Sequence, residues 1–299
     1  MFSNILKRFP SRLQKVYKSS AVISSKYFNS PSEMEKVLQL LDLTTDLEGP
    51  SVEFLAEHKW GYNQNGSDWA HICPFGPIQS PIRINTEDTH PASKCFKEAW
   101  YPLELQYSSI TTRARFTKRI YILHGDYGKM LVYPPFGKQP RVFDSVQFHF
   151  HSPSEHIVDG SLYDLELHLV HKDLRKGTIN AVLGFMFKNT GKFNPFIQKA
   201  IDALERPVEI DFAELVKDSP QFYFYHGSLT TPPCSENILW FLTSRVMEMD
   251  EKQLKFFSSR WTDNPGFAGG CGNNREVQPS FGRPVVFFDK VPDGKKNSG

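Results

Sequence analysis

Three histidines stand at alternate positions on two short apolar segments. His149 and His151 lie in QFHFH (147–151), and His168 lies in LELHLVH (165–171). In a β-strand, alternate side chains point to the same face of the sheet. If the two segments are neighbouring strands, three imidazole rings can meet at one point, which predicts a metal site with three histidine ligands.

Each segment also carries a hydrogen-bond acceptor on the same face as a histidine. Gln147 lies two positions before His149, and Glu166 lies two positions before His168. A histidine that binds a metal through one ring nitrogen donates a hydrogen bond from the other, which fixes its tautomer. Isolated core or surface histidines are the alternative. Zinc explains the combination better, because a catalytic zinc site has three protein ligands and an open fourth position.

The surrounding sequence predicts a mainly β (α+β) fold. Short apolar runs alternate with turn-rich stretches, and helical signals are few. We expect a single domain around a large, mostly antiparallel, twisted central sheet with a few short peripheral helices. The expected strands are 103–107, 121–123, 146–151, 165–171, 181–187, 222–225, 238–242 and 285–288, and the expected helices are 195–205 and 251–257, the second capped by Asp250.

Composition divides the 299 residues into four parts. Residues 1–32 form a basic, serine-rich, amphipathic leader without acidic residues, residues 33–54 a short helix and linker, residues 55–291 the folded domain, and residues 292–299 a polar tail. The leader is typical of a mitochondrial transit peptide, with secretion, another membrane route or a solvated basic tail as alternatives. No apolar stretch is long enough for a transmembrane span.

Four motifs follow one another in the order found in α-class carbonic anhydrases. They are QFHFHSPSEH (147–156), LELHLVH (165–171), GSLTTPPCSENILW (227–240) and NNREVQPSFGR (273–283). From Trp60 to about Phe288 the chain resembles that family, and the SPSEH version of the first motif is similar to bacterial and protist members. The resemblance implies reversible hydration of carbon dioxide to bicarbonate and a proton, by attack of hydroxide bound to one Zn²⁺ ion. The implied zinc ligands are His149, His151 and His168.

The same resemblance implies roles for residues around the zinc. Thr230 and Glu155 match the pair that orients the attacking oxygen and rejects anions unable to donate a proton. Gln147, Glu166 and the Asn273 carbonyl match the acceptors that hold the three histidines. The residues implied for the carbon dioxide site are Val170, Val182, Leu229, Thr231, Ile238 and Trp240. Tyr62 is implied to hold a water in the cavity.

The sequence departs from the family where fast members carry a proton-shuttling histidine. Asp126 stands at that position, and His124 lies two residues before it. A carboxylate with a pKa near its usual value of about 4 accepts protons poorly at pH 7, whereas a histidine near about 6.5 suits the task. We expect His124 to act as the shuttle, with slow transfer or transfer to external buffer as the alternative.

The four cysteines are Cys73, Cys95, Cys234 and Cys271, and no CxxC pair occurs among them. The resemblance implies a disulfide between Cys73 and Cys234, as in many secreted members. Such bonds persist in oxidising compartments, so a mitochondrial protein with this bond would fit the intermembrane space better than the matrix. The alternative is that the two thiols stay reduced. The sequence suggests no pairing for Cys95 or Cys271.

Two functions follow from these observations. The first is a zinc lyase that acts on carbon dioxide and bicarbonate, and the second is a non-catalytic carbonic-anhydrase-like scaffold subunit of an organelle complex, docked through the N-terminal extension. The complete ligand set and the Thr230–Glu155 pair favour the enzyme, because decayed relatives lose ligands. A three-histidine hydrolase of another fold would lack the other motifs. We expect no nucleic-acid partner.

Overall fold

The computed structural model describes residues 60–70, 72–91, 103–117, 119–133, 139–217, 219, 221–262 and 264–290. The predicted leader, the helix and linker up to residue 54, the polar tail and Cys95 lie outside the described residues. Within the described part, no helix is both long and apolar enough to cross a membrane.

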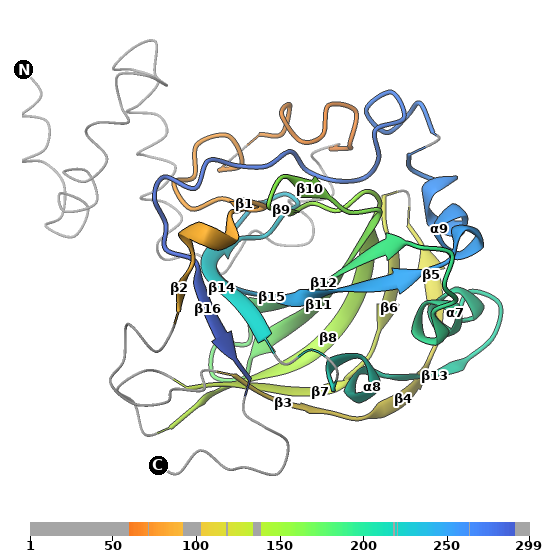
Figure 1. Cartoon of the computed structure of the whole chain (residues 1–299), viewed down its shortest axis with the longest axis horizontal. Helices are drawn as coiled ribbons and strands as arrows, with labels where there is room; N and C mark the ends of the chain where they lie inside the picture. The colour runs from red at the N-terminus through yellow and green to blue at the C-terminus, as the bar shows by residue number, and fades with distance from the viewer. Residues whose placement is uncertain are drawn as a thin grey trace, which may run out of the picture. The chain divides into compact units, whose positions relative to one another are not determined.

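A large mixed sheet forms the centre of the domain (Figure 1). In the described part of the chain its main path runs through β2 (His90–Pro91), β16 (Val286–Asp289), β14 (Gln221–Ser228), β15 (Glu236–Met249), β12 (Ile179–Asn189), β11 (Leu165–Asp173), β8 (Arg141–His151), β6 (Tyr121–His124) and β5 (Ala114–Phe116). Strand β7 (Gly128–Val132) joins β8 and pairs with β3 (Leu103–Tyr107). The pairs β12–β15 and β16–β2 are parallel and the other described pairs of this sheet are antiparallel, so the predicted fold class is confirmed.

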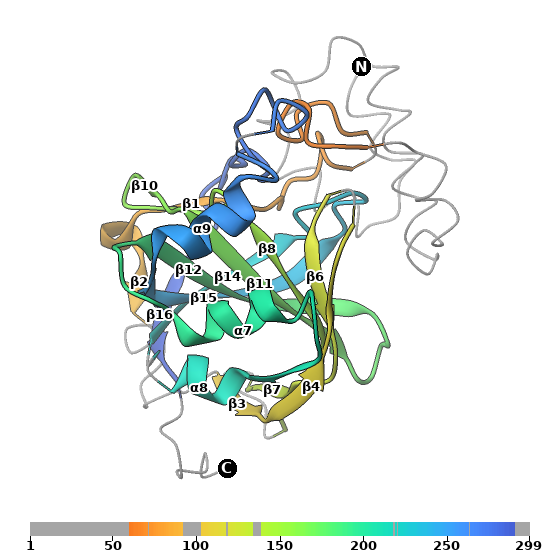
Figure 2. The same cartoon turned by 90° about the vertical axis from the view of Figure 1, so that its right-hand side faces the viewer.

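Shorter elements surround this sheet. The small strands are β1 (Arg83–Ile84), β9 (Ile157–Val158) and β10 (Ser161–Leu162), which form one sheet, and β4 (Ser109–Thr112) and β13 (Val208–Asp211), which form another. The helices are η1 (Thr86–Asp88), α7 (Pro195–Asp202), α8 (Phe212–Val216) and α9 (Glu251–Ser258). Figure 2 shows α7, α8 and α9 on the same side of the central sheet.

Side-chain caps start the helices. Asp250 forms a capping box with Gln253 at the start of α9, as the sequence predicts, and Asn194 accepts a hydrogen bond from the Ile197 N–H at the start of α7. Helix α7 ends at Asp202, three residues before the predicted end, where the chain turns. Helix α8 was not predicted, because five residues are too few to show a helical period.

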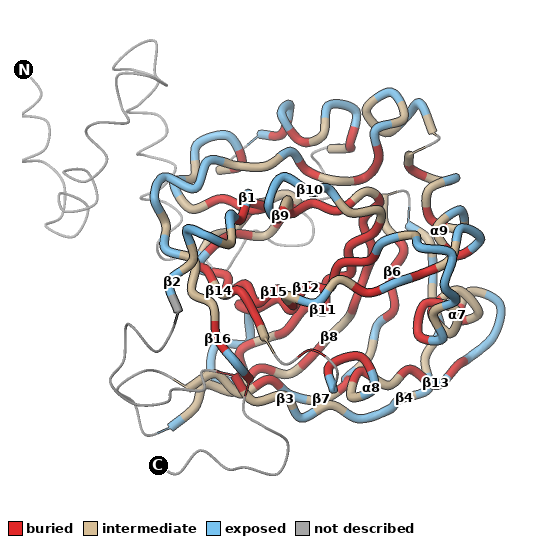
Figure 3. The backbone as a smooth tube through the Cα atoms, viewed as in Figure 1, coloured by how far each residue is buried: buried red, intermediate tan, exposed pale blue. Residues whose placement is uncertain are grey.

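The strands that carry the histidines have two different faces. Phe148, Phe150, Leu167 and Leu169 are fully buried in the larger hydrophobic cluster, which also contains residues of α7, α8 and α9. The residues between them point to the opposite face. Figure 3 shows that the central strands are buried along most of their length. The apolar face therefore fixes the strands that hold the histidines.

Replacing one of these apolar residues should weaken the whole domain. Phe148 is fully buried, and its ring centroid lies 5.3 Å from that of Tyr127 and 5.0 Å from that of Phe212. We expect Phe148→Ala to lower the free energy of unfolding by about 3–5 kcal/mol, because it leaves a cavity. In urea denaturation, Phe193→Ala is the matched control, since Phe193 is 59% exposed. Equal losses in the two variants would contradict this account of the core.

Candidate metal centre

The structure brings the three predicted histidines together. In the register of β8 and β11, His149 lies opposite His168, and His151 lies opposite Glu166. All three histidines are buried, and one ring nitrogen of each lies within 4.8 Å of the others. On β12, Gly184 lies opposite His168, so no side chain intrudes there.

The second ring nitrogen of each histidine donates a hydrogen bond to a predicted acceptor. The three bonds are His149 Nδ1 to Gln147 Oε1 at 2.9 Å, His151 Nδ1 to the Asn273 carbonyl at 2.8 Å, and His168 Nε2 to Glu166 Oε1 at 2.7 Å. Amide, carbonyl and carboxylate oxygens can only accept here, so these nitrogens carry the hydrogen. The lone pairs are therefore on Nε2 of His149, Nε2 of His151 and Nδ1 of His168.

The environment keeps the rings neutral. Burial lowers the pKa of His149 and His168, and burial with the neighbouring His168 lowers the pKa of His151 to about 3. His151 Nε2 is buried and has no hydrogen-bond partner among the described residues. Three neutral imidazole nitrogens, one of them without a protein partner, are a donor set that fits Zn²⁺.

A buried hydrogen-bond network supports His168. Burial opposes ionisation of Glu166, but His156 and His168 outweigh it and hold the pKa of this carboxyl well below its usual range. His156 Nδ1 lies 2.7 Å from Glu166 Oε1, and its Nε2 lies 2.7 Å from the Tyr225 hydroxyl, which donates to Ser80 Oγ. The chain of contacts from Ser80 to His168 fixes the orientation of that ring.

Glu155 and Thr230 lie beside the histidines. Glu155 is buried, its Oε1 accepts from the Arg275 N–H at 2.8 Å, and its Oε2 lies 3.8 Å from His168 Nδ1. Burial and the charge of Glu166 raise the pKa of Glu155 well above its usual range, and the Thr230 hydroxyl acts against this as a donor. Glu155 Oε2 has no partner at regular hydrogen-bond geometry within the described residues.

An apolar cluster lies against one side of the histidines. The Trp240 ring centroid is 4.8 Å from that of His168, and register places Val182 between Val170 and Trp240. The five predicted wall residues that belong to or pack against this cluster are Val170, Val182, Leu229, Ile238 and Trp240.

The other two predicted residues of this region lie outside that cluster. Thr231 is partly exposed, and its carbonyl accepts from the Cys234 N–H. The buried Tyr62 ring lies 6.5 Å from that of His151, and its hydroxyl has no hydrogen-bond partner in the described part of the chain.

The two candidates for proton transfer are both exposed. His124 lies opposite Gln147 in the sheet, and its Nε2 is 2.9 Å from Arg115 Nη2. Asp126 Oδ1 accepts from the Gly128 N–H, a bond that shapes the turn between β6 and β7. The shuttle role of His124 therefore stays a prediction.

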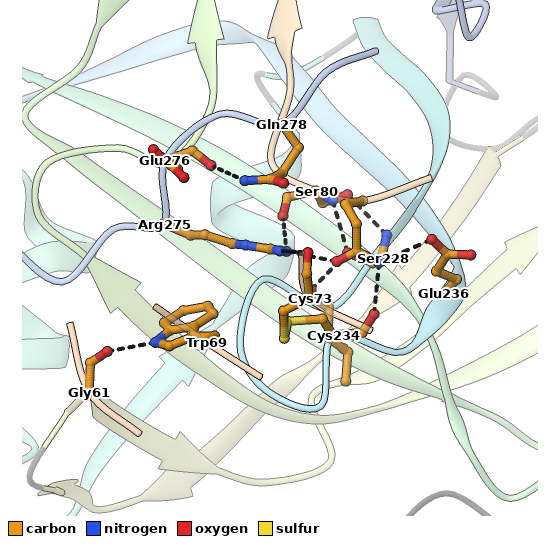
Figure 4. The surroundings of a disulfide bond; sticks show 12 residues. Gly61, Trp69, Cys73, Ser80, Ser228, Cys234, Glu236, Arg275, Glu276 and Gln278 are labelled. Atoms are coloured by element: carbon orange, nitrogen blue, oxygen red, sulfur yellow. Dashed lines mark hydrogen bonds between the residues drawn. A yellow bond between two sulfur atoms is a disulfide. The ribbon is translucent and has the colours of Figure 1, made fainter. Parts of the chain in front are cut away.

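The predicted disulfide between Cys73 and Cys234 is confirmed (Figure 4). Both cysteines are buried, and their Cα atoms are 5.2 Å apart. The bond ties the segment before β1 to the loop after β14, which also carries Thr230. Cys271 is exposed and free.

Arg275 connects this disulfide to Glu155, a role that the sequence analysis missed. Its buried guanidinium donates to the carbonyls of Cys73 and Ser80 and to Gln79 Oε1 (Figure 4). Its backbone N–H donates to Glu155 Oε1. Arginine is almost never buried without partners. Its place inside the NNREVQPSFGR motif was the signal that could have identified it.

Comparisons with known proteins agree with this geometry. The family model for eukaryotic-type carbonic anhydrase matches residues 57–288. The chain belongs to the α carbonic anhydrase family. It is 34% identical to "Alpha carbonic anhydrase 4" of Arabidopsis thaliana, over 77% of this chain and 81% of that protein. It is 33% identical to a carbonic anhydrase of Nostoc sp., with the same two coverages.

A solved structure gives the same result. The α-carbonic anhydrase of Thermovibrio ammonificans, solved with the inhibitor sulfanilamide, has a TM-score of 0.56 and 33% identity, covering 72% of this chain and 89% of that one. The protein is therefore an enzyme of the carbonic anhydrase family, as the motifs indicated.

Removing the acceptor of one histidine should weaken metal binding. We expect Gln147→Ala to reduce zinc affinity roughly tenfold, because the His149 ring loses the bond that orients it. Competition with a chelator measures the affinity. Gln106→Ala on β3 is the control, since Gln106 is exposed and its side chain bonds only Glu104 in the described structure. Unchanged affinity in the Gln147 variant would show that His149 needs no support from this amide.

Proposed function

We propose that this carbonic anhydrase depends on zinc and hydrates carbon dioxide reversibly to bicarbonate and a proton. The observation that carries the proposal is the set of three neutral imidazole nitrogens within 4.8 Å of one another, each ring held through its other nitrogen. His149, His151 and His168 would hold the ion. When bound, zinc supplies Lewis-acid chemistry that makes hydroxide available near pH 7, a property established for carbonic anhydrases.

The protein's own groups would orient the reactants. The Thr230 hydroxyl donates toward Glu155, so its lone pair is left to accept a hydrogen bond from the attacking oxygen. Glu155 stays in place because the Arg275 N–H binds its other carboxylate oxygen. An anion that cannot donate a hydrogen bond to Thr230 would bind poorly, because its own lone pair would face the lone pair of the Thr230 oxygen.

The apolar cluster would hold carbon dioxide. The side chains of Val170 and Val182 have no polar atoms, and the one polar group of the Trp240 side chain, the indole N–H, donates to the Ser228 carbonyl. Carbon dioxide has no net charge or dipole, so an apolar surface suits it better than bicarbonate. Tyr62, with its buried hydroxyl, would hold a water near His151. No described feature favours the non-catalytic scaffold.

Metal content and activity together test this function. We expect about one zinc per chain by elemental analysis, and carbon dioxide hydration in stopped flow that a sulfonamide inhibits and that zinc removal abolishes. A zinc-loaded protein that hydrates no carbon dioxide would support the scaffold instead.

One variant separates the apolar wall from the metal. Val182→Phe should reduce hydration at least roughly tenfold by filling the space beside His168, while the zinc content stays the same. Loss of zinc together with activity would refute the role of Val182 as part of a substrate wall.

We also propose that the protein works in an oxidising compartment. The buried Cys73–Cys234 disulfide supports this, since such bonds rarely persist in a reducing compartment. Combined with the basic leader expected from the sequence, the proposal favours the mitochondrial intermembrane space, with secretion as the alternative. Organelle fractionation and non-reducing mass spectrometry check it, and a reduced protein in the mitochondrial matrix would overturn it.

A further inference from the structure

Arg115 lies at the end of a row of side chains that includes two of the candidate ligands. In the sheet, Arg115 on β5 is opposite Ile122 on β6, Ile122 is opposite His149, and His149 is opposite His168. Residues directly opposite one another on antiparallel strands share a face. Arg115 therefore lies on the ligand-bearing face, on the edge strand of the main path.

His124 lies in the next row of the same face. His124 is opposite Gln147, which lies two positions before His149 on β8. Two side chains from the neighbouring segment hold it, since Thr112 Oγ1 donates to its carbonyl at 2.8 Å and Arg115 Nη2 is 2.9 Å from its Nε2. Both backbone and ring are therefore fixed from one side.

The contact with Arg115 determines the state of the imidazole. A guanidinium has only donors and stays charged in proteins, so His124 Nε2 must offer its lone pair and Nδ1 must carry the hydrogen. A neutral imidazole has a single lone pair. Arg115 thus occupies the only atom of His124 that could accept a proton. Protonation there would break the bond and place two cations side by side.

In the described part of the chain, no carboxylate contacts the His124 ring to offset the charge of Arg115. Gln147 on β8 is neutral, and the Asp126 carboxylate in the following turn binds a backbone N–H. Arg113 is near in sequence, but its guanidinium donates to a distant carbonyl, that of Glu205. Partial desolvation of the ring and the charge of Arg115 both lower the pKa of His124.

We propose that Arg115 is a positioning residue that withholds His124 from proton transfer, so that the reaction proton leaves mainly through external buffer. The proposal rests on the proposed function, because it concerns the exit of the proton that carbon dioxide hydration releases. If the proposal holds, the turnover rate at low buffer concentration depends on whether Arg115 occupies the lone pair of His124.

The test compares turnover at low and at saturating buffer in the full-length, zinc-loaded protein. We expect Arg115→Ala to raise turnover at low buffer by roughly three- to tenfold, because the lone pair of His124 is released. Turnover at saturating buffer should not change. Arg113→Ala removes the same charge two residues away and should change neither rate. Adding His124→Ala to the Arg115 variant should remove the gain.

A titration by NMR gives a readout that does not depend on activity. The pKa of His124 should rise toward the usual value for histidine in Arg115→Ala and stay depressed in Arg113→Ala. An unchanged pKa, a rise without a gain at low buffer, or a gain that survives loss of His124 would each overturn the proposal. If the protein hydrates no carbon dioxide at any buffer concentration, the proposed function fails, while the titration still decides whether Arg115 keeps His124 neutral.

Discussion

The site depends on keeping three buried imidazole rings neutral and aimed at one point. A strand's two-residue period places His149 and His151 on one face, and the register of β8 and β11 adds His168. The direction of the side chains alone would not determine which ring nitrogen of each histidine keeps its lone pair. That depends on the amide, carbonyl and carboxylate oxygens that take the other ring hydrogen.

Two buried carboxylates lie close to these rings and have opposite tendencies. Glu166 stays ionised because the rings of His156 and His168 and the backbone N–H groups of Glu155 and His156 surround it. Glu155 has fewer partners, and burial together with the charge of Glu166 raises its pKa. The two carboxylates also have different partners, since Glu166 orients the His168 ring, whereas Glu155 accepts a hydrogen bond from the Arg275 N–H.

Contacts at several distances from the three histidines hold the site in place. Next to it, aromatic packing of Phe148 and Phe150 holds β8 from behind. Further away, Arg275 links Glu155 to Cys73, and the disulfide links that segment to the loop of Thr230. Breaking one of these buried hydrogen bonds would be costly, because it would leave a donor or acceptor unpaired. By contrast, His124 at the end of β6 is exposed, and there a single arginine contacts the ring.

The sequence by itself was enough to predict the fold class, the strands around the histidines, the N-terminal cap of α9 and the three histidines that the fold brings together, because these follow from local periodicity and from motifs kept in order. It did not reveal α8, the burial of Arg275 or the contact of Arg115 with His124. Helix α8 is too short to show a helical period. The two contacts depend on strand register and on residues up to 202 positions apart, which no local pattern encodes. His124 shows the difference best. Its type and place in the sequence suggested a proton acceptor, but only the folded sheet brings the arginine that takes its lone pair.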